Sequence, residues 1–493
     1  MTIIKRNRSR VLGGMLIGFA ALGIAGCGRM DDAGNADNSK VSNPVAARLA
    51  FRDSVETPPR GATGTFRLSV DYPQKPPAPC TDCSWLNAKV NFQPGFPARP
   101  SPDAWQGGGW AAYIQSILSY VRQGQDPNLR DEVGFRTQVN GATRWYNVPW
   151  MAYDPTVGRE YRHGTTNERT AHLQDLVGAN GATLRGTTAS LGATHFLPKM
   201  TEGCRARFPN GFETWSVGYY NPFGGYALGK SIPKDGLPRA ADAMGVSMPA
   251  GLPFPQGTAV MKVLTTNAPV DCVPYLKGSP EWQVNRHVLD PASKKYMCRR
   301  AVQVSRIVQI DVAVADARSP TGWVYGTFAY NGDQRGATFW DRLMPLGVQW
   351  GADPWTFPAV PKSDSLPLQQ SVSNPGVGIF EHMGCQGRLA GPVDNPQSSC
   401  MSCHGSAYAA RIGAKSAMGV NVPPSFGFDG LCTAYSFDNA AYFQNARAPQ
   451  SYPGGKYAHA MPLDTSLQLE VALQQYGQFA TDGKPQACVD PAS

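Results

Sequence analysis

The chain has 493 residues, a formal net charge of +9, 42% hydrophobic residues and 16% charged residues. This length and apolar content fit a body of one large domain or two small domains, followed by one further domain. They exclude a wholly disordered chain. Four of the positive charges lie within residues 5–10, which leaves +5 for the remainder. No run of Lys and Arg marks a nucleic-acid surface, so nucleic acid is not an expected partner.

The start of the chain has the pattern of an export signal. Cations within residues 5–10 precede an apolar stretch at 11–25, which is short for a membrane span of about 20 residues. The stretch ends Leu22-Gly-Ile-Ala-Gly26-Cys27, which resembles a bacterial lipoprotein lipobox. That resemblance implies that residues 1–26 are a signal peptide and that Cys27 is acylated. The alternative is an ordinary secretory signal that is cleaved nearby.

We therefore expect a lipid-anchored protein on the periplasmic side of a bacterial cell envelope. Gly28 follows the cysteine in place of the Asp that tends to retain lipoproteins in the inner membrane, so the outer membrane is favoured. Residues 27–60 are polar, which predicts a flexible tether between the lipid and a folded body.

Eight cysteines remain when Cys27 and the pair at Cys400 and Cys403 are set aside. An even number in an oxidising compartment predicts up to four disulfides. The segment Cys80-Thr-Asp-Cys83 is followed by Ser84 and preceded by a Pro-rich run. No strand-to-helix junction supports a thioredoxin-like site there, so the sequence favours structural disulfides.

Residues 61–357 are predicted to form a β-rich α+β domain of unassigned function. Apolar residues at helical spacing predict a helix over 110–121, and strand-like runs cover 258–266, 308–314 and 323–330. The last two runs flank a turn and predict an antiparallel hairpin. All 11 tryptophans lie between Trp85 and Trp355, where they would fill the core or, as the alternative, line a ligand surface.

A Pro-rich linker is predicted at 358–376, and the segment that follows contains Cys400-Met401-Ser402-Cys403-His404. Cys-x-x-Cys-His is the attachment signature of a c-type haem. Two thiols three residues apart share one side of a helical turn, where both can add to the vinyl groups of one porphyrin. The adjacent imidazole can then bind the iron axially. The alternative is a zinc-ligand pair or a redox dithiol.

Residues 377–493 resemble a monohaem class I c-type cytochrome domain. The resemblance implies one covalent haem with thioethers at Cys400 and Cys403 and His404 as proximal iron ligand. It also implies a sixth ligand from Met461, with His459 as the alternative, ahead of a closing helix. Asp464 is the predicted N-cap of that helix, whose apolar face would carry Leu469, Ala472, Leu473 and Tyr476.

The expected fold is therefore a large β-rich α+β domain followed by a small all-α c-type cytochrome domain. The expected function is single-electron transfer with a redox partner that the β-rich domain positions. Two alternatives remain: an oxidoreductase whose large domain oxidises a small molecule or sugar and passes electrons to the haem, and a haem-based ligand sensor. Dinucleotide, serine-hydrolase and zinc-protease motifs are absent from the sequence.

Overall fold

A computed structural model describes residues 69–92, 105–130, 135–148, 153–154, 158–159, 166–167, 202–208, 212–232, 250–290, 296–351, 370–376, 389, 391, 400–404, 407–409, 461–470 and 472–473. Cys27 and the tether at 27–60 lie outside these residues. Among the helices of the described ranges, none is both long and apolar enough to cross a membrane.

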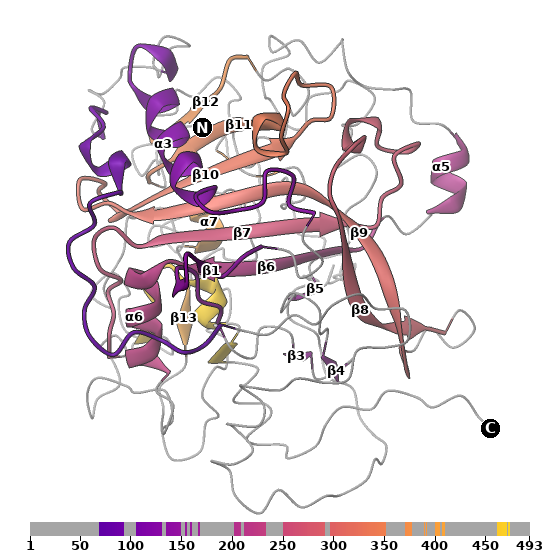
Figure 1. Ribbon diagram of the computed structural model, residues 1–493, viewed down its shortest axis with the longest axis horizontal. Helices are drawn as coiled ribbons and strands as arrows, with labels where there is room; N and C mark the ends of the chain where they lie inside the picture. Colours follow the sequence, from indigo (N-terminus) through magenta and orange to yellow (C-terminus); the bar gives the residue numbers. More distant parts are fainter. Residues whose placement is uncertain are drawn as a thin grey trace, which may run out of the picture.

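One antiparallel sheet of eight strands organises the described structure (Figure 1). Its order is β12-β11-β10-β9-β7-β6-β5, and β8 pairs only with β9. The strands of this sheet are β5 (Thr166–Asn167), β6 (Thr214–Tyr220), β7 (Ala259–Thr266), β8 (Glu281–Leu289), β9 (Tyr296–Ala315), β10 (Trp323–Tyr330), β11 (Leu343–Gln349) and β12 (Ser371–Ser373).

Shorter elements surround the sheet. The helices are α3 (Trp110–Val121), α5 (Glu202–Arg207), α6 (Pro222–Ser231) and α7 (Cys400–His404), with 3-10 turns η1 (Ser84–Asn87), η5 (Pro274–Leu276) and η6 (Trp340–Arg342). Three two-stranded pairs complete the set: β1 (Gln138–Val139) with β2 (Ala142–Thr143), β3 (Tyr153–Asp154) with β4 (Gly158–Arg159), and β13 (Tyr408–Ala409) with β14 (Met461–Pro462).

The local predictions for the large body are confirmed. The predicted helix is α3, and the predicted strands are β7, the second half of β9, and β10. Strands β9 and β10 form the predicted antiparallel hairpin, with Trp323 opposite Ala315. The first half of β9 pairs with β8 and leaves the sheet as a two-stranded ribbon at the lower right of Figure 1.

One face of the sheet packs against α3 and η1 through a large apolar and aromatic cluster. Trp110 of α3 stacks on Trp350 with ring centroids 4.2 Å apart, and both side chains are buried. Gly326 of β10 makes this contact close, because a Cβ there would lie 2.3 Å from Cδ1 of Ile114. This face is the main hydrophobic core, and most of the described tryptophans are part of it.

The opposite face carries a second buried cluster. It includes residues of α6, of α7 and of the described residues 461–470 and 472–473, which we call the C-terminal segment. Met401, Leu463, Leu469 and Leu473 pack there with Tyr325 of the sheet. Gly218 of β6 leaves room for this segment, since a Cβ there would lie about 2 Å from the Gln468 side chain. The C-terminal segment is therefore part of the same packed body as the sheet.

The prediction of a small, separate all-α cytochrome domain is wrong for the part of the chain that the structure describes. There the C-terminal region contains the five-residue helix α7, the β13–β14 pair and helical turns at 467–470 and 472–473. Their buried apolar side chains form one cluster with residues of β6 and β10. The sequence pattern could not show this, because an amphipathic segment buries its apolar face equally well on a sheet or on another helix.

Candidate functional site

Helix α7 carries the Cys-x-x-Cys-His motif and is attached to the sheet at its first turn. The amide of Cys400 donates to the carbonyl of Leu389 (2.8 Å), and the amide of Met401 donates to Oε1 of Gln349 (3.2 Å). Amides in the first turn of a helix have no partner within the helix, so these acceptors satisfy groups that would otherwise be unpaired. The side chain of Met401 is 3% exposed and anchors the helix in the second cluster.

The imidazole of His404 has a defined hydrogen-bond partner. Its Nδ1 lies 2.7 Å from the backbone carbonyl oxygen of Thr465, 61 residues further along the chain. A carbonyl oxygen can only accept, so Nδ1 carries the proton and donates it. In the neutral ring with the proton on Nδ1, the lone pair is on Nε2, which is the nitrogen that can bind a metal.

Tyr325 of β10 contacts both members of this hydrogen bond. Its ring centroid lies 4.6 Å from that of the His404 ring, and its hydroxyl donates to Oγ1 of Thr465 (2.6 Å). Burial raises the pKa of Tyr325 well above its ordinary value, and the hydrogen bond to Thr465 opposes that shift only in part. The phenol therefore stays protonated and remains a donor at neutral pH.

The turn that presents the Thr465 carbonyl has an uncommon backbone conformation. Asp464 has φ 48° and Thr465 has φ 65°, in the left-handed region. Such a value is rare for a β-branched residue, and it persists only where the surroundings impose it. Here Phe254 donates its amide hydrogen to Oδ2 of Asp464 (2.7 Å). The residue that follows, Ser466, is held by a hydrogen bond with Tyr220.

The contact with Tyr220 joins its hydroxyl to Oγ of Ser466 at 2.7 Å. The same Ser466 oxygen accepts the amide of Leu469 (3.2 Å), which is the arrangement of an N-cap. The prediction that Asp464 caps this helix is wrong, because its carboxylate bonds Phe254 instead. The predicted burial of Leu469, Ala472 and Leu473 is confirmed, while Tyr476 lies outside the described residues.

The residues that hold the motif occupy a single row across the sheet. The register aligns Tyr220, Val260, Ala313, Tyr325 and Gln349 on neighbouring strands β6, β7, β9, β10 and β11. Tyr220 and Gln349, at the two ends of this row, bond Ser466 and Met401, and Tyr325, next to Gln349, bonds Thr465. The sheet thus positions α7 and the 464–466 turn together, although they are about 60 residues apart in the chain.

The remaining predicted site residues have different outcomes. Met461 lies in β14, where its backbone pairs with Ala409 of β13, five residues after His404. The side chains of Met461 and Cys403 lie outside the described set, as do all atoms of His459 and Cys27. Met461 and His459 therefore stay predictions for the sixth ligand.

The groups that support His404 could not be identified from the sequence. Tyr325 lies in a strand that periodicity predicted, but periodicity does not say which element its hydroxyl meets. Thr465 contributes a backbone carbonyl, which has no sequence signature at all. Gln349 offered only a weak sign: it is a fully buried amide at the end of an apolar strand.

Two disulfides are present among the described cysteines, Cys80–Cys83 and Cys204–Cys272. Each lies beside a carboxylate, Asp82 or Asp271, in a group whose atoms are close enough to hold a metal ion. Because the four sulfurs are paired with one another, they offer no thiolate ligands in this state. The pairing of the other four cysteines stays a prediction, because their side chains lie outside the described set: Cys298, Cys385, Cys432 and Cys488.

No protein-family model, curated protein or solved structure matches the chain. Its function is therefore inferred from the motif and from the residues around it.

Proposed function

We propose that the chain is an exported, lipid-anchored c-type cytochrome that carries one covalent haem and transfers single electrons. The observation that best supports this proposal is the hydrogen bond from His404 Nδ1 to the Thr465 carbonyl. Imidazoles that bind metals commonly donate the other ring proton to such an oxygen, which fixes the tautomer and the ring orientation. The donor set of two thiols and one imidazole also suits a haem.

The proposed roles follow from the chemistry of each side chain. Cys400 and Cys403 would form the two thioether bonds, and Nε2 of His404 would bind the iron. When bound, the haem supplies a one-electron Fe(III)/Fe(II) couple. The Thr465 carbonyl would increase the basicity of the imidazole by accepting the hydrogen bond from Nδ1, and Tyr325 would restrain the plane of the ring.

Met461 is the proposed sixth ligand, and His459 is the alternative. A thioether raises the reduction potential relative to a second imidazole, and this suits an electron carrier. A lipid at Cys27 with the tether of residues 27–60 would keep the protein on the periplasmic side of the envelope, within reach of a membrane-bound redox partner. The sheet, which holds α7, would form the body that this partner meets.

The first test is haem content. Mature protein produced with the c-type assembly machinery should contain one haem per chain by pyridine haemochrome assay, and the haem should resist acid-acetone extraction. The double variant Cys400→Ala/Cys403→Ala should contain none, while Ser402→Ala, within the same motif, should keep a full complement. Colourless wild-type protein, or a motif that holds zinc or a Cys400–Cys403 disulfide, would refute the proposal.

The second test concerns the sixth ligand and the competing functions. Met461→Ala should lose the weak red charge-transfer band of Met/His iron, and His459→Ala should keep it. Carbon monoxide should bind the reduced wild-type protein poorly; ready binding would favour the sensor alternative. Reduction of the haem by a small molecule or sugar without any partner would favour the oxidoreductase alternative.

A further inference from the structure

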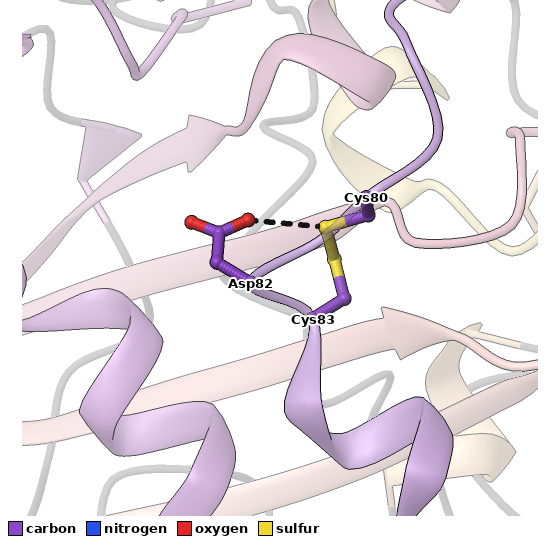
Figure 2. A group of neighbouring side chains, drawn as sticks. All are labelled: Cys80, Asp82 and Cys83. Carbon is purple, nitrogen blue, oxygen red and sulfur yellow. Dashed lines mark hydrogen bonds between the residues drawn. A yellow bond between two sulfur atoms is a disulfide. The ribbon is translucent and has the colours of Figure 1, made fainter.

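The Cys80–Cys83 disulfide joins residues only three positions apart, immediately before η1 (Figure 2). Cys83 is buried, with 2% of its surface exposed, whereas Cys80 is only partly buried. Cys80 is therefore the more exposed of the two cysteines, and Cys83 is the protected one. This asymmetry is what an exchange reaction needs, since it decides which sulfur is attacked and which one leaves.

Both sulfurs lie next to hydrogen-bond acceptors. Oδ1 of Asp82 is 3.3 Å from Sγ of Cys80, the contact drawn in Figure 2, and the carbonyl oxygen of Gly257 is 3.6 Å from Sγ of Cys83. A disulfide sulfur has no proton, so neither oxygen gains a hydrogen bond in the oxidised state. Two thiols could each donate to one of these oxygens, so the surroundings fit the dithiol better than the disulfide.

The carboxylate of Asp82 is held in place by a second group. Nη2 of Arg144 lies 3.1 Å from Oδ2 of Asp82, and the same nitrogen donates to Oε1 of Gln123 (2.7 Å). The guanidinium also lies 4.1 Å from the centre of the Tyr120 ring. With Oδ2 occupied by arginine, Oδ1 is the oxygen that faces the sulfur.

The Cys204–Cys272 disulfide also lies beside an arginine–carboxylate pair, Arg207 and Asp271, but it differs in loop length, in burial and in the group that contacts its sulfurs. Its cysteines are 68 residues apart and both are buried, with exposures of 2% and 5%. The neighbouring group is a donor, since Nη2 of Arg207 lies 3.4 Å from Sγ of Cys204 and 3.0 Å from Sγ of Cys272. A donor matches the lone pairs that disulfide sulfurs keep. The long loop also restricts the unfolded chain far more than a loop of four residues does, so this bond fits a structural role.

We propose that Cys80–Cys83 is a thiol–disulfide exchange site whose substrate is a protein dithiol. A thiolate of the partner attacks Sγ of Cys80, the Cys80–Cys83 bond breaks, and the Cys83 sulfur leaves, takes up a proton and donates to Gly257. The second partner thiolate attacks the mixed disulfide and releases Cys80, which takes up a proton and donates to Asp82. Two electrons and two protons pass to the chain, and the partner becomes a disulfide. In the reverse sequence the Cys80 and Cys83 thiols reduce a partner disulfide, and the Cys80–Cys83 bond forms again. The site does not depend on the haem.

The first test compares the two disulfides within the same folded chain. Full-length mature protein is equilibrated in mixtures of reduced and oxidised dithiothreitol, the thiols are alkylated, and each pair is quantified by peptide mass. Cys80–Cys83 should be half-reduced at a reduced-to-oxidised ratio at least tenfold lower than Cys204–Cys272, with unchanged near-UV circular dichroism. Opening of both pairs together, or of Cys204–Cys272 first, would overturn the proposal.

The second test concerns the direction of attack. Cys83→Ser leaves the more exposed Cys80 as a thiol, which should attack a thioredoxin whose resolving cysteine is replaced by serine and whose remaining cysteine is a thionitrobenzoate mixed disulfide. The attack forms the Cys80–thioredoxin disulfide and releases thionitrobenzoate. Cys80→Ser leaves only the buried Cys83 and should trap at least tenfold less of this probe. Equal trapping, in variants with wild-type circular dichroism, would contradict the assigned roles.

The third test concerns the acceptor. Asp82→Asn should make the Cys80–Cys83 pair about tenfold harder to reduce, which corresponds to about 30 mV, because the Cys80 thiol loses its charged acceptor. Asp271→Asn changes the carboxylate beside the other disulfide and should leave the Cys80–Cys83 equilibrium unchanged. If the Cys80–Cys83 pair were reduced at the same dithiothreitol ratio in Asp82→Asn and in the wild type, Asp82 would not be the acceptor that stabilises the dithiol.

Discussion

The two faces of the sheet are built from different chemistry. On the α3 face, indole and aliphatic side chains such as Trp110, Ile114 and Trp350 pack into a continuous apolar core. On the α7 face, the central row presents Tyr220, Tyr325 and Gln349, which bond the C-terminal segment through hydroxyl and amide groups. Apolar packing is not directional, whereas hydrogen bonds specify distance and angle. Both faces bury apolar side chains, and the hydrogen bonds of the α7 face in addition orient one imidazole.

Adjacent residues of β6 show this contrast directly. Tyr219 points into the α3 face, and its buried hydroxyl has no partner among the described residues. Tyr220 points to the α7 face and contacts Ser466. The same residue type is thus used as a large apolar side chain on one face and as a hydrogen-bonding group on the other.

The largest expected effect is on the apolar face. Trp110→Ala removes a buried indole stacked on Trp350 and should lower the free energy of unfolding by about 3–5 kcal/mol, as measured by urea denaturation. Below the transition, the His404 Nδ1 proton should keep its NMR chemical shift, because the Thr465 acceptor lies on the other face. A change in that shift in the folded variant would mean that the two faces are not separable.

Alkaline pH should destabilise both faces through their buried tyrosines. Burial raises the pKa of Tyr219, Tyr220 and Tyr325 above the value near 10 that an unfolded tyrosine has. Below about pH 10 both states are protonated, and above it only the unfolded state loses protons. Each such tyrosine should therefore lower the free energy of unfolding by about 1.4 kcal/mol per pH unit above pH 10. Denaturation series at several pH values should show a shallower slope in Tyr325→Phe.

Tyr325→Phe tests the support of His404. The variant keeps the ring but leaves Oγ1 of Thr465 without this donor, at an expected cost of about 1–2 kcal/mol. The His404 Nδ1 proton should exchange faster with solvent, and the haem-loaded protein should change its reduction potential. Tyr330→Phe, on the α3 face, is the matched control and should change neither. An unchanged exchange rate in Tyr325→Phe would show that Thr465 needs no side-chain restraint.

The smallest effects should come from the adjacent pair in β6. Tyr220→Phe removes the contact with Ser466 and should cost about 1 kcal/mol in thermal or urea unfolding. Tyr219→Phe removes a hydroxyl that has no described partner, so it should be neutral or slightly stabilising. A larger loss of unfolding free energy in Tyr219→Phe than in Tyr220→Phe would contradict the division between the faces.

Several features of this protein follow from short segments of the sequence. The apolar spacing of residues 110–121 and the alternation around residues 308–314 were sufficient to predict α3 and part of β9, because each depends on one face meeting a core. The Cys-x-x-Cys-His motif likewise depends only on the spacing of neighbouring side chains. The polarity of the alternating residues was misleading in one respect: Gln309 is fully buried, because the second face of the sheet is also covered.

The tertiary structure decided what surrounds the motif. The acceptor for His404 is a main-chain oxygen 61 residues away, presented by a left-handed threonine that no local propensity favours. The tyrosine beside it comes from strand β10, far earlier in the chain, and the packing of α7 on this face of the sheet brings the two together. The packing of α7 on the sheet, in place of a separate helical domain, has the same cause. Apolar periodicity specifies that a face of a helix or strand is buried. Contacts between distant parts of the chain decide which element buries it.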